Sequence, residues 1–228
     1  MERLLVFLAL LCGGHAERQD LSDSVFTFPL ATGTSYVKLT ANVTQPIAAM
    51  TVCLRFHSEL TRGQSLFSLA TPNSPNALWL YKPSVGVYRV YVRATSLDIG
   101  GQPDTTDEWN SVCWTWDSAS GLTAVWVNGK RSARKVLKRG VTVSGAPSIV
   151  LGQDQDTYGG GFQEGESFVG DITDVHVWDS VISPCEIRFY MEGNAFAHGN
   201  IINWKDLQYT PTGTVHVEKS DFDKLSCY

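Results

Sequence analysis

The residues best suited to chemistry lie in one glycine-rich loop, residues 151–167, which contains Asp154, Asp156, Glu164 and Glu166. Carboxylates this close repel one another unless a cation lies between them, and Ca²⁺ accepts about six to eight oxygen ligands in irregular geometry. Glycines allow the backbone to turn tightly, so that carbonyl and carboxylate oxygens can converge on one point. The alternating aspartates of an EF-hand are absent. The loop therefore predicts a calcium site of another type, with a solvated acidic surface loop as the alternative.

Paired carboxylates could also serve a glycoside hydrolase, which needs an acid and a nucleophile or base about 5–9 Å apart. The pairs that lie close in this sequence are those of the acidic loop, where metal binding explains them better. The histidines are scattered along the chain and suggest no Ser-His-Asp or Cys-His constellation. Because no convergent catalytic roles emerge, we expect a binding protein and not an enzyme.

The start of the chain, residues 1–16, resembles a secretory signal peptide, with Arg3, a short apolar run and a small-x-small cleavage site at Gly14-His-Ala16. That run is shorter than the roughly 20 apolar residues of a membrane helix, and no later segment approaches this length. We therefore expect a secreted, extracellular protein with no membrane insertion. No linker or repeat divides residues 17–228, so a single domain is the simplest interpretation.

The charge distribution and a glycosylation motif indicate what lies on the surface. The net charge of −5 argues weakly against a general nucleic-acid binder, and a basic run within residues 130–139 has no interleaved aromatics. We interpret this run as the solvated face of a strand, with partner binding as the less favoured alternative. Asn42-Val-Thr44 is a glycosylation sequon and predicts that Asn42 is exposed.

Four cysteines remain after the signal peptide, Cys53, Cys113, Cys185 and Cys227, and an extracellular protein would hold them as disulfides. Four cysteines allow three pairings. Cys53 and Cys113 lie in alternating, strand-like segments, so we expect a bridge between two strands, worth roughly 4 kcal/mol in the chain-entropy model. Cys185 and Cys227 would then pair, either to staple the C-terminal tail or to link two chains.

Period-two alternation of apolar residues recurs, for example in residues 52–56 and 112–116, and predicts a chain made mostly of antiparallel strands. Asn128-Gly129 predicts a type I′ hairpin. One helix is expected after Ser183, because Ser183-Pro-Cys-Glu186 is a capping box with proline at the first helical position, and Gly193 is placed to end it.

Aromatic side chains fall into two groups. Tyr81 and Tyr91 flank residues 82–84, which we interpret as a polar turn, and their rings could lie beside the acidic loop if the two hairpins meet. The tryptophans within strand-like runs are expected in the core, in preference to stacking on a ligand: Trp114, Trp116, Trp126 and Trp178.

The segment Cys113-Trp-Thr-Trp-Asp-Ser118 is similar to the pentraxin signature His-x-Cys-x-Ser/Thr-Trp-x-Ser/Thr, with Ser111 where histidine is expected. Further segments in family order extend this resemblance to the short pentraxins over nearly all of residues 17–228: Phe26-Thr-Phe-Pro29, Thr34-Ser-Tyr-Val37, Thr51-Val-Cys-Leu54, Ser65-Leu-Phe-Ser68, Leu151-Gly-Gln-Asp-Gln-Asp156 and Gly170-Asp-Ile172.

The resemblance implies an all-β jelly-roll sandwich of two antiparallel sheets, the concanavalin-like lectin fold, with one short helix on a face. It further implies a homopentamer or another ring oligomer. On the face opposite the helix it implies two Ca²⁺ ions per subunit, which capture phosphocholine, phosphoethanolamine or an acidic polysaccharide. The implied role is a secreted pattern-recognition protein of innate immunity, with complement and Fc receptors as further partners.

The implied calcium site departs from the family pattern in ways that change its charge. Pro75 stands where the family has an aspartate, and Gln163 where it has an acidic residue, with Glu164 next to it as a substitute. Glu166 replaces a family glutamine and returns one negative charge. We therefore expect weakened calcium binding. The ligands carried over by position are Asn76, Asp154, the backbone carbonyl of Gln155, Asp156, Gln163 and Glu166.

The implied ligand pocket contains Tyr81 and Tyr91, which match a pair of pocket tyrosines in part of the family, with Trp79 beside them. A glutamate with which some members meet a choline ammonium has no counterpart here, although aromatic faces hold such cations by roughly 0.5–2 kcal/mol. The alternative function is a calcium-independent pentraxin-fold protein that acts through protein contacts, because Pro75 weakens the metal site.

Overall fold

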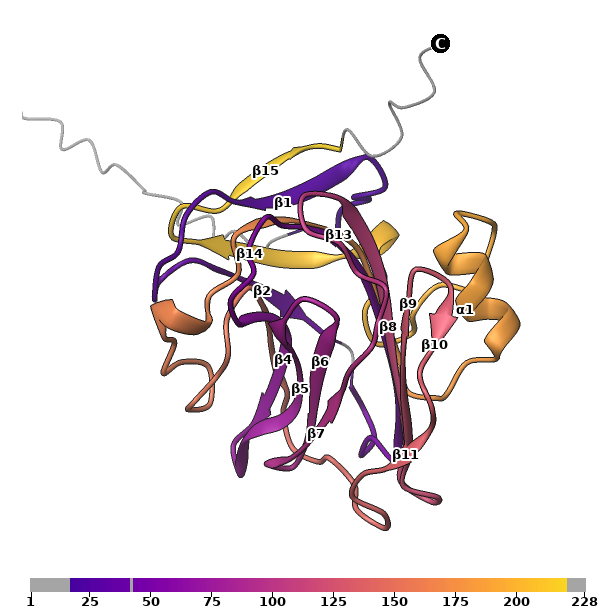
Figure 1. Cartoon of the computed structure of the whole chain (residues 1–228). Coiled ribbons are helices and arrows are strands. Elements are labelled where there is room, and N and C mark those ends of the chain that lie inside the picture. Colours follow the sequence, from indigo (N-terminus) through magenta and orange to yellow (C-terminus); the bar gives the residue numbers. More distant parts are fainter. Residues whose placement is uncertain (1–16, 42, 221–228) are drawn as a thin grey trace, which may run out of the picture.

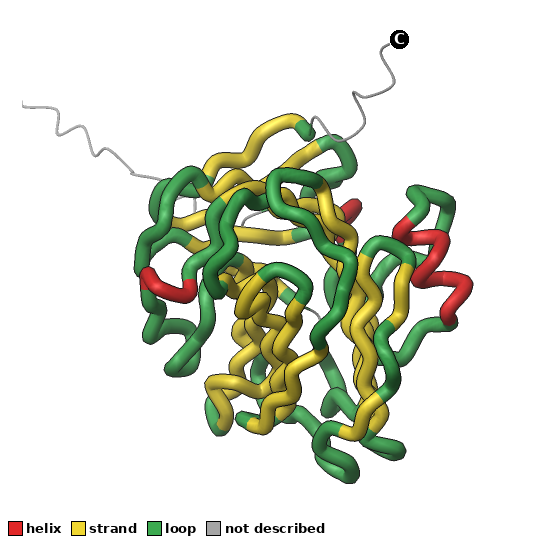
Figure 2. Tube along the Cα trace, in the orientation of Figure 1, coloured by secondary structure: helices red, strands yellow, loops and turns green. Residues whose placement is uncertain are grey.

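A computed structural model describes residues 17–41 and 43–220 of the chain (Figure 1). The expected signal peptide, the sequon residue Asn42 and Cys227 lie outside the described residues. Strands make up most of the ordered structure and stack as two sheets, which Figure 2 shows in yellow. Among the described residues no helix is long and apolar enough to cross a membrane.

The first sheet carries eight strands, and each of its pairs is antiparallel. Its order is β10 (Lys130–Arg131), β9 (Leu122–Val127), β8 (Trp109–Asp117), β3 (Ala49–His57), β13 (Gly170–Trp178), β1 (Ser24–Phe28) and β15 (His216–Lys219), and β11 (Lys135–Val136) also pairs with β9.

The second sheet carries seven strands, again all antiparallel. Its order is β14 (Gln208–Thr212), β2 (Tyr36–Thr40), β12 (Ser148–Leu151), β4 (Gln64–Thr71), β5 (Ser74–Ser84), β6 (Val87–Val92) and β7 (Thr95–Ile99). The predicted sandwich of two antiparallel sheets is confirmed.

The main core lies between the two sheets, because alternate residues of each strand point to the same side. Trp114 and Trp116 of β8 are buried in this core, as predicted. Trp126 and Trp178 are also buried, but they lie in a second apolar cluster on the outer face of the eight-stranded sheet.

The second cluster exists because helix α1 (Pro184–Met191) packs on that outer face (Figure 1). Ile187 and Tyr190 supply its buried side. The predicted capping box is present: the Ser183 hydroxyl accepts from the Glu186 N–H, and the Glu186 carboxylate accepts from the Ser183 N–H. Gly193 follows with a φ of +73°, which stops the helix.

The disulfide between Cys53 and Cys113 is confirmed, and it joins residues that face each other in register on β3 and β8. Its two sulfurs lie within the second cluster, beneath α1. Cys185, in the first turn of α1, is exposed and has no disulfide partner among the described residues.

The expected polar turn at residues 82–84 is wrong, because β5 continues through Ser84 and the chain reverses at Val85 and Gly86. Gly86 has a φ of +72°, which suits the turn. Lys82, predicted to lie in this turn, is instead buried, and its ammonium lies 3.0 Å from the carboxylate of Asp104. An ion pair between residues on different segments leaves no local signal in the sequence.

Candidate functional site

Three aromatic rings form a ladder on the outer face of the seven-stranded sheet. Leu78 and Leu80 of β5 fill the main core, so the alternating Trp79 and Tyr81 point to the other side. Trp79 lies between its neighbours, with ring centroids 4.7 Å from Tyr81 and 4.5 Å from Tyr91 of β6. Trp79 is 4% exposed, whereas the two tyrosines are half-buried. The structure therefore brings the three predicted pocket aromatics together, with the tyrosines as the accessible rings.

The connection between β3 and β4 positions Tyr81 against the acidic loop. Gly63 makes room for the phenol, since a Cβ at this position would lie 1.8 Å from the Tyr81 hydroxyl oxygen. Arg62 donates to the backbone carbonyl of Ser167 at 2.8 Å and so ties this connection to the acidic loop. Burial raises the pKa of Tyr81, and the nearby charge of Glu166 raises it further. The charge of Glu166 thus reaches Tyr81, which is the tyrosine that the β3–β4 connection contacts.

The carboxylates of the acidic loop act on one another through their charges. Asp154 follows β12, is 3% exposed, and its Oδ1 has no hydrogen-bond partner. Burial, and then the charges of Glu166 and Asp156, raise the pKa of Asp154 to about 7. Burial and the charge of Asp156 also raise the pKa of Glu166. Neighbouring negative charge thus disfavours the ionisation of Asp154 and of Glu166, and a bound cation would relieve that repulsion.

The two glutamines of the loop have different partners. The Gln155 amide donates to the carbonyls of Ser148, at 2.9 Å, and Ser68, at 3.1 Å, which fixes this side chain within the fold. Any metal contact of Gln155 therefore falls to its backbone carbonyl, as the family resemblance implies. The Gln163 amide donates to the Asp156 carboxylate at 2.5 Å. Gln163 holds Asp156 in place and adds no charge.

Asn76 lies near the start of β5, and its Oδ1 is buried without a hydrogen-bond partner. Pro75 is exposed and offers no side-chain oxygen. Within residues 17–41 and 43–220, no group of three or more His, Cys, Asp or Glu side chains is placed to hold a metal ion. The candidate donors instead combine carboxylates with amide and carbonyl oxygens, a mixture that suits Ca²⁺ better than a transition metal. The unpartnered oxygens of Asp154 and Asn76 fit such an ion.

Sequence reasoning missed the residues that support this site. Arg62 and Gly63 were not singled out, because an arginine next to a glycine in a connecting segment is common and their target, Tyr81, lies on another strand. Ser65 was also missed; its hydroxyl accepts from the Trp79 indole at 2.9 Å. Strand register brings these residues to the site, and single-residue patterns do not reveal register.

Comparisons with known proteins agree over nearly the whole chain. The Pentaxin family profile matches residues 24–219. C-reactive protein of Sus scrofa is 41% identical, over 96% of this chain and 98% of its own length. Serum amyloid P-component of Rattus norvegicus is 40% identical, over 99% and 100%. The chain belongs to the pentraxin family.

A solved structure of a pentraxin supports the same assignment for the fold. The heptameric SAP-like pentraxin from Limulus polyphemus superposes with a TM-score of 0.77 at 27% identity, over 89% of this chain and 97% of that one. The two-sheet architecture with one helix is therefore the pentraxin fold.

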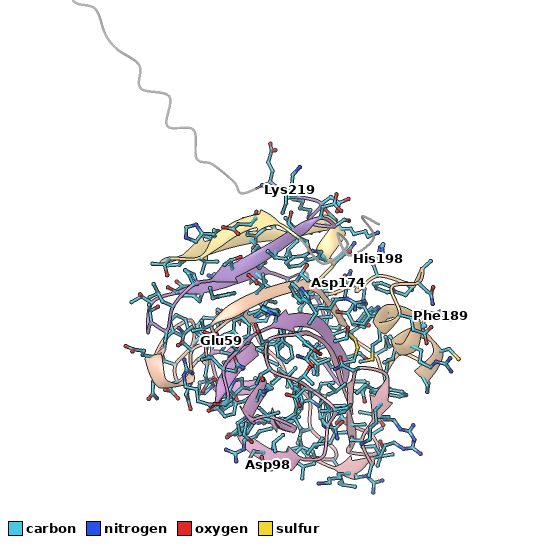
Figure 3. The ribbon with its side chains drawn as sticks, turned by 45° about the horizontal axis from the view of Figure 1, so that its top comes forward. Glu59, Asp98, Asp174, Phe189, His198 and Lys219 are labelled. Carbon is cyan, nitrogen blue, oxygen red and sulfur yellow. A yellow bond between two sulfur atoms is a disulfide. The ribbon has the colours of Figure 1, made fainter. Side chains whose placement is uncertain are left out.

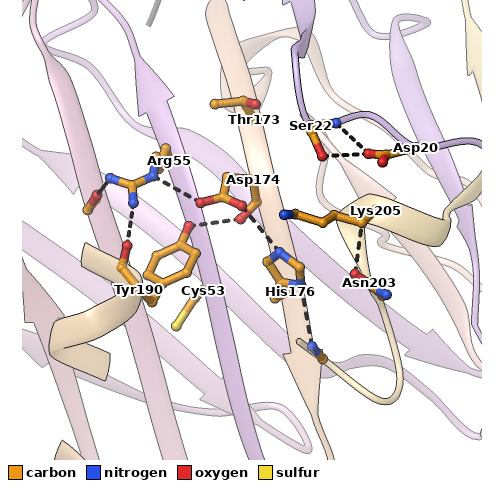
Figure 4. A network of polar contacts seen from close by, with 12 residues as sticks. Asp20, Ser22, Cys53, Arg55, Thr173, Asp174, His176, Tyr190, Asn203 and Lys205 are labelled. Atoms are coloured by element: carbon orange, nitrogen blue, oxygen red, sulfur yellow. Dashed lines mark hydrogen bonds and ion pairs between the residues drawn. The ribbon is translucent and has the colours of Figure 1, made fainter. Parts of the chain in front are cut away.

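The opposite face of this pentraxin holds a different, partly buried carboxylate, Asp174 of β13 (Figure 4). Arg55 Nε donates to Asp174 Oδ2 at 3.0 Å, and His176 Nε2 lies 3.2 Å from Oδ1. Tyr190 of α1 donates its hydroxyl to the Asp174 carbonyl at 2.8 Å and accepts an arginine hydrogen bond on its own carbonyl. Burial alone would raise the pKa of Asp174, but His176 and Arg55 outweigh it and lower this pKa. This carboxylate is satisfied within the fold.

Proposed function

We propose that this pentraxin is a secreted, calcium-dependent pattern-recognition protein of innate immunity. Its ligands are phosphocholine, phosphoethanolamine or acidic polysaccharides on microbial or damaged-cell surfaces. The observation that carries the proposal is the unpartnered Oδ1 of Asp154, with the charges of Asp156 and Glu166 acting on this carboxylate, on the same side as the Tyr81–Trp79–Tyr91 ladder. A cationic centre next to accessible aromatic faces suits a ligand with an anionic and an ammonium end.

The residues have separate tasks in this proposal. Asp154, Asp156, Glu166, Asn76 and the Gln155 carbonyl supply oxygens for two Ca²⁺ ions per subunit, with Gln163 holding Asp156. The bound ions supply open positions to phosphate or carboxylate oxygens. Tyr81 and Tyr91 then contact the rest of the ligand, and Arg62 keeps the acidic loop against Tyr81.

Ring assembly supports the same role. The relatives include a SAP-like pentraxin described as heptameric, and we propose a homopentamer or another ring for this chain. Sites repeated around a ring raise effective affinity for a repetitive surface by about 10²–10⁴ without new contacts. Complement and Fc receptors remain proposed partners for the helix face. No catalytic activity is proposed.

A second candidate is favoured by Pro75, which removes a side-chain oxygen from the implied calcium site. Under this alternative the chain is a calcium-independent pentraxin-fold protein that acts through protein contacts. It predicts partner binding that is unchanged by a chelator, whereas the calcium-dependent function predicts loss of binding.

Calorimetric titration of the purified protein tests the two candidates. Ca²⁺ is added first, then phosphocholine, phosphoethanolamine or a sulfated polysaccharide, each with and without EGTA. Calcium-dependent ligand binding that is lost in Asp154→Asn, with Asp98→Asn as a surface control, supports the proposed function. No calcium binding at millimolar concentration would reject it. Pro75→Asp should tighten calcium binding, because it returns a charged oxygen to the site.

A further inference from the structure

The aromatic ladder on the seven-stranded sheet lies next to a cation that the proposed function leaves unused. Arg89 of β6 is the cross-strand partner of Tyr81, and the residue that follows it, Val90, lies in the main core. Because successive side chains of a strand point to opposite faces, Arg89 lies on the outer face with the ladder. Its side chain is 35% exposed. Burial and the charge of Glu166 raise the pKa of Tyr81, whereas the charge of Arg89 opposes both. Tyr81 is therefore subject to the charge of the acidic loop and to that of a guanidinium.

Asp98 of β7 fixes the position of this guanidinium. Nε and Nη2 of Arg89 donate to the two carboxylate oxygens of Asp98, at 2.6 and 2.8 Å, and the two residues face each other in register. Hydrogen bonding to Asp98, and to a smaller extent contact with Tyr91, raises the pKa of Arg89, so this side chain stays charged. Since β6 lies between β5 and β7, Arg89 is on the ladder side of the pair and Asp98 on the far side. Figure 3 shows Asp98 at the lower margin of the molecule, well away from His198 and Phe189 on the helix side.

The net charge around this ion pair is positive. Lys135 of β11 donates its ammonium to the backbone carbonyl of Asp98 at 3.0 Å, so two cations accompany one carboxylate. The cross-strand partner of Tyr91 on β7 is Ser96, which brings no charge to the ladder. A guanidinium also carries more N–H donors than the two that Asp98 accepts. An anionic group above the tyrosines would therefore be attracted and could accept further hydrogen bonds, whereas an ammonium group would be repelled.

We propose that Arg89 sets the ligand preference of this face, an inference that rests on the proposed function. The preferred ligand is an acidic saccharide with two anionic groups. Its first anionic group is held at the calcium site, its sugar ring lies against Tyr81 and Tyr91, and its second group, a sulfate or a carboxylate, accepts hydrogen bonds from Arg89. The planar fork of a guanidinium suits such oxygens better than a lysine ammonium does. Phosphocholine and phosphoethanolamine present an ammonium in place of the second anion and bind more weakly.

Calorimetry with three probes in millimolar calcium tests this preference. The probes are a uronate–hexosamine disaccharide with one sulfate, the same disaccharide without the sulfate, and phosphocholine. The wild type should bind the sulfated disaccharide about tenfold more tightly than the unsulfated one, as expected for one hydrogen-bonded charge. Arg89→Ser should remove most of this difference and should bind phosphocholine more tightly than the wild type does.

Control variants separate the role of this guanidinium from a general loss of charge. Arg188→Ser removes an exposed arginine of α1, which pairs with Glu192 at 3.6 Å on the opposite face, and should leave all three affinities unchanged. Arg89→Lys keeps the charge without the planar fork, so phosphocholine should still bind weakly while the preference for the sulfated disaccharide falls in part. Asp98→Asn retains Arg89 and should retain calcium-dependent binding.

The same titrations distinguish failure of this inference from failure of the proposed function. If none of the probes binds in calcium, the proposed function fails and the preference fails with it. If the probes bind but the ratio of the two disaccharide affinities is the same in the wild type and in Arg89→Ser, the preference is overturned while the calcium-dependent function stands. Salt dependence gives a second readout, because added salt should reduce the sulfate preference of the wild type and have little effect on Arg89→Ser. A wild-type preference that is insensitive to salt would assign it to shape and not to the charge of Arg89.

Discussion

Asp154 is a buried carboxylate and Asp174 a partly buried one, and they lie on opposite faces of the sandwich and in opposite electrostatic surroundings. Asp174 has Arg55 and His176 as partners, which lower its pKa. Asp154 has an unpartnered oxygen and two carboxylate neighbours, and its pKa is raised to about 7. The charge of Asp174 is balanced by residues of the fold itself. The charge of Asp154 has no such partner and requires a bound cation.

This difference separates a structural site from a binding site. A partly buried ion pair with additional hydrogen bonds holds α1 against the eight-stranded sheet, since Arg55 and Asp174 both contact Tyr190. An unpaired buried carboxylate is costly and is retained where a ligand completes it. The helix face should therefore respond to mutation through stability, and the acidic face through calcium.

The largest effect is expected from removing Arg55. Arg55→Met replaces a buried guanidinium and leaves the partly buried Asp174 without its cationic partner, and this should lower the free energy of unfolding by about 3 kcal/mol. Urea denaturation in calcium-free buffer measures the change. Arg89→Met is the matched control, because the Arg89–Asp98 pair at 2.6 Å is partly exposed and should contribute under about 1 kcal/mol. Equal losses in the two variants would contradict the contrast between the faces.

Calcium should stabilise the acidic face by a somewhat smaller amount. At a free concentration of about 100 times Kd, calcium raises the free energy of unfolding by about 2.7 kcal/mol for one site. Asp154→Asn should remove most of this gain, whereas Asp174→Asn should keep it although the variant is less stable overall. Thermal unfolding with and without EGTA checks both. A full calcium gain in Asp154→Asn would exclude Asp154 as a ligand.

The sequence was sufficient for features with local signals. The capping box of Ser183 and Glu186 predicted α1, and alternation around Cys53 and Cys113 predicted paired strands with a bridge between them. The acidic loop could also be recognised, because its carboxylates are adjacent in sequence. Its relation to Tyr81 was conditional on two hairpins meeting, which alternation cannot decide.

Contacts between residues far apart in the chain could not be predicted from the sequence. The sequence predicts a polar turn at Lys82, and no residue near Lys82 in the sequence indicates its buried partner Asp104. Arg55 and Asp174 sit 119 residues apart and meet through the pairing of β3 with β13. Such contacts follow from register, which is a property of the whole sheet.

The two faces should also differ in how stability depends on pH. In calcium-free protein the raised pKa of Asp154 means that the native state holds a proton more tightly than the unfolded chain. The free energy of unfolding therefore decreases as pH rises from about 4 to about 7. Asp154→Asn should remove this decrease, so the variant exceeds the wild type by about 1–2 kcal/mol at pH 8 and not at pH 4.

Asp117 provides a control, because its pKa is shifted in the opposite direction to that of Asp154. Hydrogen bonding from Ser120 lowers the pKa of Asp117, so its stabilisation is present above the unfolded pKa and is lost as pH falls through the lowered value. Asp117→Asn should thus be less stable than the wild type at pH 8. If Asp154→Asn shifts stability in the same direction as Asp117→Asn, the buried carboxylate is not destabilising in the absence of calcium.

The smallest effect is expected from Gly63→Ala, which should weaken headgroup binding on the acidic face and leave calcium binding nearly unchanged. Gly63→Ala places a Cβ 1.8 Å from the present position of the Tyr81 hydroxyl oxygen, so the phenol must move away from the acidic loop. Asp154, Asp156 and Glu166 do not contact this methyl group, and calcium affinity should stay within about twofold. Because Tyr81 supplies part of the proposed ligand contact, headgroup affinity should fall several-fold, less than the roughly tenfold that corresponds to 1.4 kcal/mol. Calorimetry with calcium and then phosphoethanolamine distinguishes the two effects. Gly100→Ala, where no atom lies near the added Cβ and φ is not positive, controls for a remote glycine substitution. If Gly63→Ala weakens calcium and ligand equally, Tyr81 acts through the metal site and not as a separate contact.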